Sequence, residues 1–383
     1  MRRAWAPEAP HLYHIGGYYY LMIAEGGTEH FHSVVIARCE TVDGWYEGFK
    51  GNPVMTHRHF GKYYPIDNVG HADLVDTPDG NWYAVMLGSR LLEGPHKNLG
   101  RETWICPVDW EDDWPVFSPG TGKVEWKYPA DPKLPWTPLP KEPERDDFDS
   151  LELGLHWSFW GVPYQDYWKI ENSCLKLKCL PRPMTRELHG FDVQHPDMSK
   201  DDCISFLGRR QRNESFDLMA EMHFAPREGE AAGIMLLQAA NHQLRLENTC
   251  IQGRYMLRLV QATTKQKGLP FLPGYEAQTK EEVLVEQEIN TDILSFRVKA
   301  RKQQYTFFCG VNEYTLKPMG PAVDVRNINP EEIGGMIGTM IGMFATANGK
   351  DSQNEAAFEY FEIIPVNKSG GNCNDKSADG QKR

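Results

Sequence analysis

The chain has 383 residues, enough for two domains that each bury a core of their own. It carries 41 basic and 53 acidic side chains, for a net charge of −12 at pH 7, and the nearest approach to a basic stripe is Arg209-Arg210-Gln211-Arg212. This balance disfavours binding to nucleic acid, which needs clustered cations. No stretch approaches the ~20 apolar residues of a membrane span, and residues 1–7 lack the apolar core of a signal peptide. As written, the chain is therefore expected in the cytoplasm, away from membranes.

Aromatic side chains make up 11% of the chain. Such rings are common where sugars bind, because the C–H face of a pyranose packs well on an aromatic face. All-β cores also favour aromatic residues, and composition alone favours that simpler explanation.

Strand signals fill the first third of the chain, in short runs rich in Tyr, Val, Ile and Phe that Gly, Asn, Asp and Pro interrupt. Residues 11–15 and 18–24 flank a Gly16-Gly17 turn and predict a hairpin. Residues 72–76 and 81–87 flank a Thr-Pro-Asp-Gly turn and predict a second one. Two similar antiparallel units in series are typical of β-propeller blades, which are small antiparallel sheets set around an axis.

The composition changes sharply between Tyr128 and Asp147, where six prolines lie among charged residues. Such a segment is stiff and extended, as a semi-rigid spacer between domains is. Further strand-like runs follow almost without helical periodicity, and sheets that no helix covers pack face to face. The sequence therefore predicts propeller blades at 1–128, a linker at 129–146, a β-sandwich at 147–366 and a disordered tail at 367–383. Because the linker is stiff, we also expect a broad apolar contact between the domains.

Several blocks of the sequence follow one another as they do in one enzyme family. They are Pro7-Glu8-Ala9-Pro10-His11-Leu12-Tyr13, Gly17-Tyr18-Tyr19-Tyr20-Leu21, Ala24-Glu25-Gly26-Gly27-Thr28, Gly70-His71-Ala72-Asp73-Leu74-Val75, Leu99-Gly100-Arg101-Glu102-Thr103, Trp114-Pro115-Val116 with Pro119-Gly120, Phe206-Leu207-Gly208-Arg209-Arg210-Gln211 and Gly342-Met343-Phe344-Ala345. Together they resemble glycoside hydrolase family 43, which holds β-xylosidases and α-L-arabinofuranosidases. The resemblance implies an all-β fold, a partial five-bladed β-propeller followed by a concanavalin A-like β-sandwich.

The resemblance makes Glu8 the catalytic acid. Glycoside hydrolysis needs two carboxyl groups, one that donates a proton to the leaving oxygen and one that activates water or attacks. The family inverts configuration, so its second carboxylate acts as a base on water. Glu8 lies just ahead of an expected strand, where Pro7 and Pro10 restrict the backbone around it. The simpler alternative is a solvated surface glutamate.

Three further positions match substrate-binding residues of the family. Arg101 matches an arginine that reaches into the sugar pocket, where its fork of donors can bond hydroxyls; the alternative is a surface salt bridge with Glu102. His71 matches a histidine near the propeller axis, and the alternative is a hydrogen-bonded core residue. Thr28 matches a pocket-lining hydroxyl, or is an ordinary turn residue. No Cys/His set has zinc-ligand spacing, so no metal site or cofactor is assigned, while a central calcium ion near His71 stays open.

The sequence departs from the family at its start. The family's base is an aspartate near the start of the first blade, and a second aspartate in the next blade tunes the acid; both precede the acid. Only seven residues precede Glu8, so both aspartates and about two of five blades are expected to be missing. Asp67 and Asp73 lie near the matching blocks but match neither aspartate. Where the family's sandwich can send a Phe into the active site, this chain has Ile337.

The implied function is the inverting hydrolysis of terminal xylosyl or arabinofuranosyl residues from hemicellulose-derived glycans. The expected partner is an oligosaccharide or xylan-derived substrate, and oligomerisation stays open. Because the base is expected to be absent, the alternative is a non-catalytic carbohydrate-binding β protein or an inactive fragment.

Overall fold

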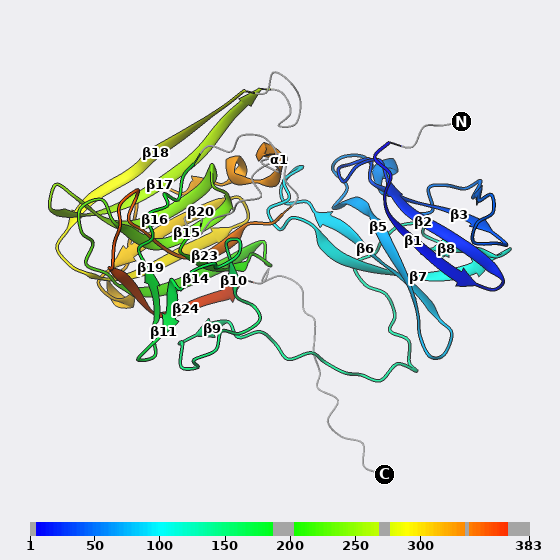
Figure 1. Cartoon of the computed structure of the whole chain (residues 1–383), viewed down its shortest axis with the longest axis horizontal. Helices are drawn as coiled ribbons and strands as arrows, with labels where there is room; N and C mark the ends of the chain where they lie inside the picture. Colours follow the sequence, from blue (N-terminus) through cyan, green and yellow to red (C-terminus); the bar gives the residue numbers. More distant parts are fainter. Residues whose placement is uncertain (1–4, 187–202, 268–275, 334–336, 367–383) are drawn as a thin grey trace, which may run out of the picture.

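The computed structural model describes residues 5–186, 203–267, 276–333 and 337–366. They form two bodies at opposite ends of the long axis, joined by a stretch without strands that loops out below them (Figure 1). The described residues hold one short α-helix, α1 (Pro330–Ile333), and the 3-10 turns η1 (Arg58–Phe60), η3 (Glu313–Thr315) and η4 (Arg326–Ile328). None of these helices has the length and apolarity needed to cross a membrane. The predicted all-β class is confirmed.

The first body consists of two four-stranded antiparallel sheets, ordered β1-β2-β3-β4 and β5-β6-β7-β8. Their strands are β1 (Glu8–Ile15), β2 (Tyr18–Glu25), β3 (Ser33–Cys39), β4 (Glu47–Gly48), β5 (Ile66–Asp76), β6 (Trp82–Arg90), β7 (Glu102–Glu111) and β8 (Trp114–Phe117). Both predicted hairpins are present, since Ile15 pairs with Tyr18 and Asp76 pairs with Trp82. Each sheet is a meander of consecutive strands, as in a propeller blade.

The core of the first body is built from alternate residues of its strands. Tyr20 and Met22 of β2 and Ala84 and Met86 of β6 are buried in one hydrophobic cluster. Side chains alternate between the two faces of a strand, so residues two apart lie on the same face. One face of each sheet is therefore apolar and packs into the core.

The second body is a sandwich of two antiparallel sheets. One sheet has the order β10-β13-β23-β15-β16-β17-β18, and the other β11-β12-β24-β14-β19-β20-β21, with β22 paired to β20 and β9 to β24. The strands are β9 (Arg145–Asp146), β10 (Ser158–Phe159), β11 (Trp168–Ile170), β12 (Leu175–Lys178), β13 (Phe206–Arg210), β14 (Ser215–His223), β15 (Ala231–Ala239), β16 (His242–Ile251), β17 (Arg254–Lys267), β18 (Glu276–Ile289), β19 (Ile293–Arg301), β20 (Gln304–Gly310), β21 (Lys317–Pro318), β22 (Val323–Asp324), β23 (Met340–Thr346) and β24 (Glu355–Pro365). The sequence predicted this arrangement from strands that no helix covers.

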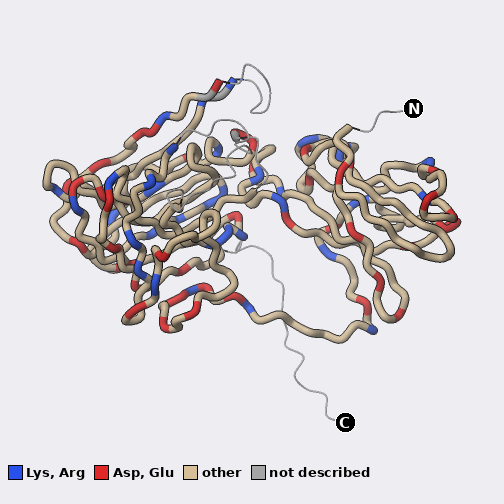
Figure 2. Tube along the Cα trace, in the orientation of Figure 1, with Lys and Arg blue, Asp and Glu red and all other residues tan. Residues whose placement is uncertain are grey.

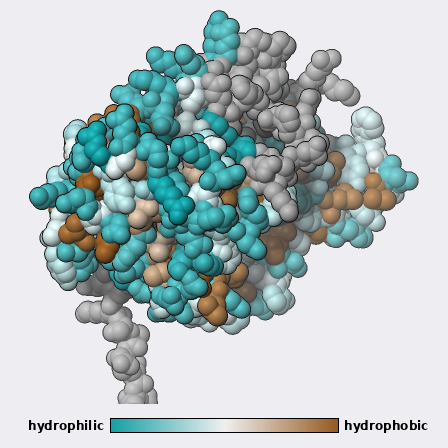
Figure 3. Space-filling model, turned by 60° about the vertical axis from the view of Figure 1, so that its left-hand side comes forward, coloured by the Kyte–Doolittle hydropathy of each residue, from teal (hydrophilic) through white to brown (hydrophobic). Residues whose placement is uncertain are grey.

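The large hydrophobic core lies between these two sheets. Leu218 of β14 and Leu236 of β15 both belong to it. A smaller cluster on the other face of the seven-stranded sheet comprises Met184, Ile204, Phe206, Met235, Leu237 and Phe344. Strand β15 is therefore buried on both faces, whereas the outer surface seen in Figure 3 is mainly hydrophilic with scattered apolar residues.

The contact between the two bodies is polar. The buried Gln303 donates through Nε2 to the Leu92 carbonyl oxygen at 3.0 Å and to Asn98 Oδ1 at 2.8 Å. Lys302 and Glu93 form an ion pair of 2.9 Å, and charged residues of both signs lie where the bodies meet (Figure 2). Each hydrophobic cluster of the described residues belongs to one body only. The contact thus differs from the broad apolar one expected, because a propeller loop makes it and the polar groups of a buried loop need partners.

Buried histidines make the stability of the fold sensitive to acid. His32, His57 and His242 are at most 1% exposed, and burial lowers the pKa of all three, to about 4 for His242. Below a pH of about 6.5 the unfolded chain therefore binds more protons than the folded one. As a result, the free energy of unfolding decreases as the pH is lowered. With a folded-state pKa of about 4, His242 alone is expected to contribute a loss of about 2 kcal/mol between pH 7 and pH 5.

Urea unfolding across this pH range checks the prediction. We expect the midpoint to fall steadily toward pH 5 and His242→Gln to flatten the profile. A midpoint that stays constant or rises toward pH 5 would contradict it.

Candidate active site

Glu8 is the first residue of β1 and lies at a β-bulge. It pairs with Ala24 of β2, whereas the next pair along the ladder is His11 with Met22. Two residues of β1 therefore face one of β2, and Ala9 takes a positive φ of 49°. Bulges are frequent beside active sites, where they re-aim a side chain. Glu8 is exposed, so a substrate can reach its carboxyl group.

The strand β5 is irregular twice, on either side of Gly70. Register shifts separate Asp67 from Gly70 and Gly70 from Ala72, and the half-buried His71 takes a positive φ of 53°. A Cβ on Gly70 would lie 2.6 Å from ring atoms of His32. Only glycine therefore allows the His32 ring to lie this close to the strand.

His32, which the sequence analysis did not single out, lies at the centre of the site. It is fully buried, and its Nδ1 lies 2.8 Å from the Asn68 carbonyl oxygen. A carbonyl oxygen only accepts, so Nδ1 carries the proton and Nε2 is an acceptor. Burial lowers the pKa of His32, although the hydrogen bond to Asn68 opposes this, and the ring is neutral at pH 7. Its Nε2 is buried and has no hydrogen-bond partner among the described residues.

Three of the four predicted site residues lie near enough to this ring for their charges to act on it. The charges of Glu8, His71 and Arg101 all act on the pKa of His32, and the centroids of the His32 and His71 rings are 6.4 Å apart. They come from β1, from the kink of β5 and from the residue just before β7. The fourth, Thr28, is half-buried in the loop between β2 and β3, four residues before His32. The roles assigned to these four residues stay predictions.

Arg101 follows Gly100, which has a positive φ of 66°, and immediately precedes β7. The sequence left open a surface salt bridge between Arg101 and Glu102. Instead, Glu102 binds Arg90 through both carboxylate oxygens, at 2.7 Å each. No ion pair of Arg101 occurs in the part of the chain that the structure describes, and the residue is half-buried.

Two aspartates near the site already have partners. Asp67 is 3% exposed and lies 2.9 Å from His30 Nδ1 and 3.6 Å from Lys97 Nζ. Asp73 is exposed and lies 2.7 Å from His11 Nδ1. We therefore assign the role of catalytic base to neither of them.

Ile337, expected where the family can carry a Phe, lies beside the site. It forms an isolated antiparallel bridge with Gly100, the residue before Arg101, and it is 57% exposed. Its side chain is therefore accessible next to the loop that carries Arg101.

The central calcium ion stays a prediction. Calcium prefers six to eight oxygen ligands, whereas His71 and His32 offer ring nitrogens. Within the described ranges, the one compact group of His, Cys, Asp or Glu ligand atoms is Glu221, His223 and Glu359, on β14 and β24 of the sandwich. The residues around His71 thus form no such group by themselves.

Comparison with known proteins matches both bodies. Residues 1–115 match the sequence model described as glycosyl hydrolases family 43, and residues 145–364 match the one described as the beta xylosidase C-terminal concanavalin A-like domain. The chain is 34% identical to a xylosidase/arabinosidase of Butyrivibrio fibrisolvens, over 94% of this chain and 65% of that protein. It is 33% identical to a non-reducing end alpha-L-arabinofuranosidase of Bacteroides ovatus, over 94% of this chain and 62% of that protein.

Solved structures of family 43 proteins also resemble this chain. The family 43 protein of a xyloglucan locus in Bacteroides ovatus superposes with a TM-score of 0.79 at 32% identity, over 95% of this chain and 66% of that one. A xylan beta-1,4-xylosidase from Bacillus halodurans gives a TM-score of 0.80 at 26% identity, over 94% and 65%. The chain thus spans just under two thirds of the length of these relatives. Since the concanavalin-like model alone covers more than half of its residues, the chain belongs to glycoside hydrolase family 43, with blade-like propeller sheets followed by a concanavalin A-like β-sandwich.

Proposed function

We propose that this protein hydrolyses terminal xylosyl or arabinofuranosyl residues of hemicellulose-derived glycans with inversion of configuration. The observations that support this most are the exposed Glu8 at a β-bulge, the His71 ring 6.4 Å from the buried His32 ring, and the action of the charges of Glu8 and Arg101 on the pKa of His32. An accessible carboxyl group beside hydrogen-bonding side chains is the arrangement that a sugar-cleaving pocket needs.

In this proposal Glu8 acts as the general acid. It donates its proton to the glycosidic oxygen while the bond between that oxygen and the anomeric carbon breaks. Water attacks the anomeric carbon from the opposite face, and its proton passes to a carboxylate base. The family resemblance assigns this base to an aspartate ahead of the acid in chain order. Arg101 donates hydrogen bonds to sugar hydroxyls or to that base, and His71 and Thr28 line the pocket.

The names of the relatives refer to two kinds of substrate, xylosides and arabinosides. The Butyrivibrio fibrisolvens relative is named for both xylosides and arabinosides, and a Bacillus subtilis relative, 27% identical over 92% of this chain, is named a beta-xylosidase. Xylosides and arabinofuranosides therefore both belong in the test.

The test uses the chain in two arms, because it spans about two thirds of the length of its relatives. Residues 1–383 are assayed alone, and also mixed with the amino-terminal third of the Butyrivibrio fibrisolvens relative. The substrates are an aryl β-xyloside, an aryl α-arabinofuranoside and, as a control, an aryl β-glucoside. We expect one or both pentosides to be hydrolysed in the mixed arm, with the inverted anomer as first product in proton NMR.

The other outcomes are equally informative. Turnover by residues 1–383 alone, abolished by Glu8→Ala, would place the base within these residues. Binding of xylo-oligosaccharides without turnover in either arm would favour the carbohydrate-binding alternative and overturn the proposed hydrolysis.

A further inference from the structure

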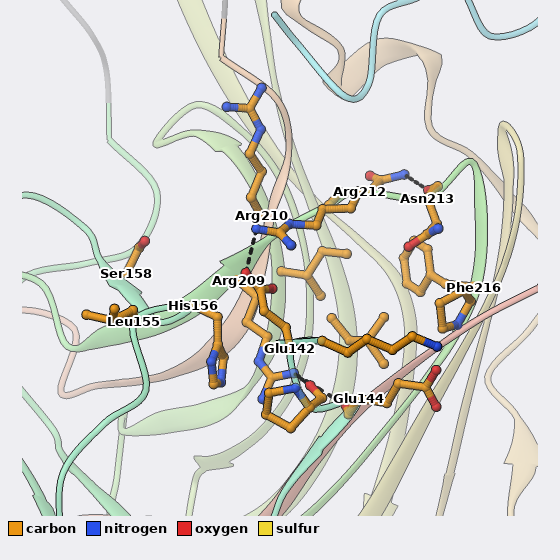
Figure 4. A pocket seen from close by; sticks show the side chains of 16 residues that line it. Glu142, Glu144, Leu155, His156, Ser158, Arg209, Arg210, Arg212, Asn213 and Phe216 are labelled. Carbon is orange, nitrogen blue, oxygen red and sulfur yellow. Dashed lines mark hydrogen bonds and ion pairs between the residues drawn. The ribbon is translucent and has the colours of Figure 1, made fainter. Parts of the chain in front are cut away.

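The loop that carries Arg101 is held by the sandwich. Arg210, the last residue of β13, donates through Nη2 to the Leu99 carbonyl oxygen at 2.7 Å and to the Arg101 carbonyl oxygen. One charged nitrogen thus binds the backbone on both sides of Gly100. In Figure 4 the Arg210 side chain extends away from those of Arg209 and Arg212; all three border a pocket of about 410 Å³ between the sandwich and residues 141–144.

The backbone of the sandwich touches the same loop. A Cβ on Gly100 would lie 2.2 Å from the Gly338 nitrogen, and a Cβ on Gly338 would lie 2.3 Å from the Leu99 carbonyl oxygen. The next residue, Thr339, donates its backbone N–H to the Asn98 carbonyl oxygen at 2.9 Å. Glycine at both positions therefore allows the two backbone segments to touch, so a shift of the loop would also move residues 338–339, just ahead of β23.

Among the described residues, the propeller contacts this loop through a turn and an ion pair. Gly100 N donates to the Lys97 carbonyl oxygen at 2.7 Å, which closes a turn within the loop, and Lys97 Nζ lies 3.6 Å from Asp67. Lys97 is also shared with the sandwich, because its backbone N–H donates to Glu331 Oε2 at 3.3 Å. The carbonyls of residues 98, 99 and 101 all accept from sandwich donors.

From these contacts we propose that Arg210 is a positioning residue: it fixes the backbone from which Arg101 enters the sugar pocket. This inference rests on the proposed function, and it gives the sandwich a part in the geometry of the active site. Hydrogen bonds from a charged donor are shorter and stronger than neutral ones, so two of them on neighbouring carbonyls hold the loop firmly. A displacement of about 1 Å in a substrate-positioning group can cost about 10²-fold in rate.

Arg212 provides a matched control. It lies two residues beyond Arg210, its side chain is 63% exposed, and its guanidinium pairs with Glu142 at 2.7 Å. Its carbonyl oxygen accepts from Arg90 at 3.2 Å, a bond that an alanine retains. Arg212→Ala therefore removes the same charge from the same segment without a change at residues 97–101.

The first measurement is amide hydrogen exchange on residues 1–383, which needs no activity. Arg210→Ala should speed exchange of the amides of residues 99–103 by about tenfold, because their anchor is lost. Arg210→Lys should give an intermediate change, and Arg212→Ala none. Unchanged exchange in Arg210→Ala, or an equal change in Arg212→Ala, would overturn the proposal.

The second measurement is a double-mutant cycle with Arg101, in the arm that turns over a pentoside. Arg210→Ala should lower kcat/KM by about tenfold in the parent and leave it unchanged once Arg101→Ala is present. A loss of the same size in both backgrounds would mean that Arg210 acts on stability alone and would overturn the role. A failure of the proposed function looks different: neither arm hydrolyses a pentoside, while the exchange result still decides whether Arg210 holds the loop.

Discussion

Replacement of Glu8 by Gln is expected to lower the turnover of an aryl xyloside or arabinofuranoside by about 10²–10⁴-fold. The amide keeps the size of the side chain, but its N–H protons are far too weakly acidic to be transferred to the leaving oxygen. The bulge at Ala9 and Pro10 should hold the substituted side chain in the same place, so the loss should lie in the chemical step. KM should change far less than kcat.

The leaving group distinguishes this role from a merely structural one. A dinitrophenolate leaves without protonation, so Glu8→Gln should lose much less activity on a dinitrophenyl glycoside than on a phenyl glycoside. Glu47→Gln is the matched control, because Glu47 is exposed on β4, at the opposite edge of the same sheet. Equal losses on both leaving groups would contradict the assignment of Glu8 as the acid.

Replacement of Arg101 by Ala is expected to lower kcat/KM by about 10²-fold, because the guanidinium fork that orients the sugar is lost. Arg101→Lys should restore only a small part, since an ammonium group cannot make the same two parallel hydrogen bonds. Lys127→Ala, which removes an exposed charge beyond the last propeller strand, serves as the control. Steady-state kinetics in the active arm measure all three variants, and an Arg101→Lys variant with full activity would show that only the charge matters.

The regular part of the fold could be predicted because its signals are local. Gly16-Gly17 marks the first hairpin, alternate apolar residues mark strands such as β2, and the prolines between Tyr128 and Asp147 fall in the stretch without strands. Part of the site could also be predicted, since the blocks around Glu8, His71 and Arg101 each carry a short motif. The tail predicted to be disordered lies outside the described residues.

The rest depends on contacts between distant segments, which leave no local signal. His32 looks like any histidine before a strand, and only its position beside Gly70 and the Asn68 carbonyl oxygen shows that it is central. The polar contact between the bodies was missed for a similar reason. It depends on a buried amide pair, Gln303 with Asn98, and each of these residues taken alone is an ordinary surface type.

The most direct test of the account is a crystal structure of the Glu8→Gln variant with a bound xylo- or arabino-oligosaccharide. We expect the glycosidic oxygen to lie about 2.6–3.2 Å from the amide of residue 8, with sugar hydroxyls on the guanidinium of Arg101. We also expect Nε2 of His32, which has no partner among the described residues, to accept a hydrogen bond from a sugar hydroxyl, from water or from a neighbouring side chain. A sugar bound elsewhere, or one whose glycosidic oxygen lies beyond the reach of residue 8, would contradict the claim that these residues form one hydrolytic site.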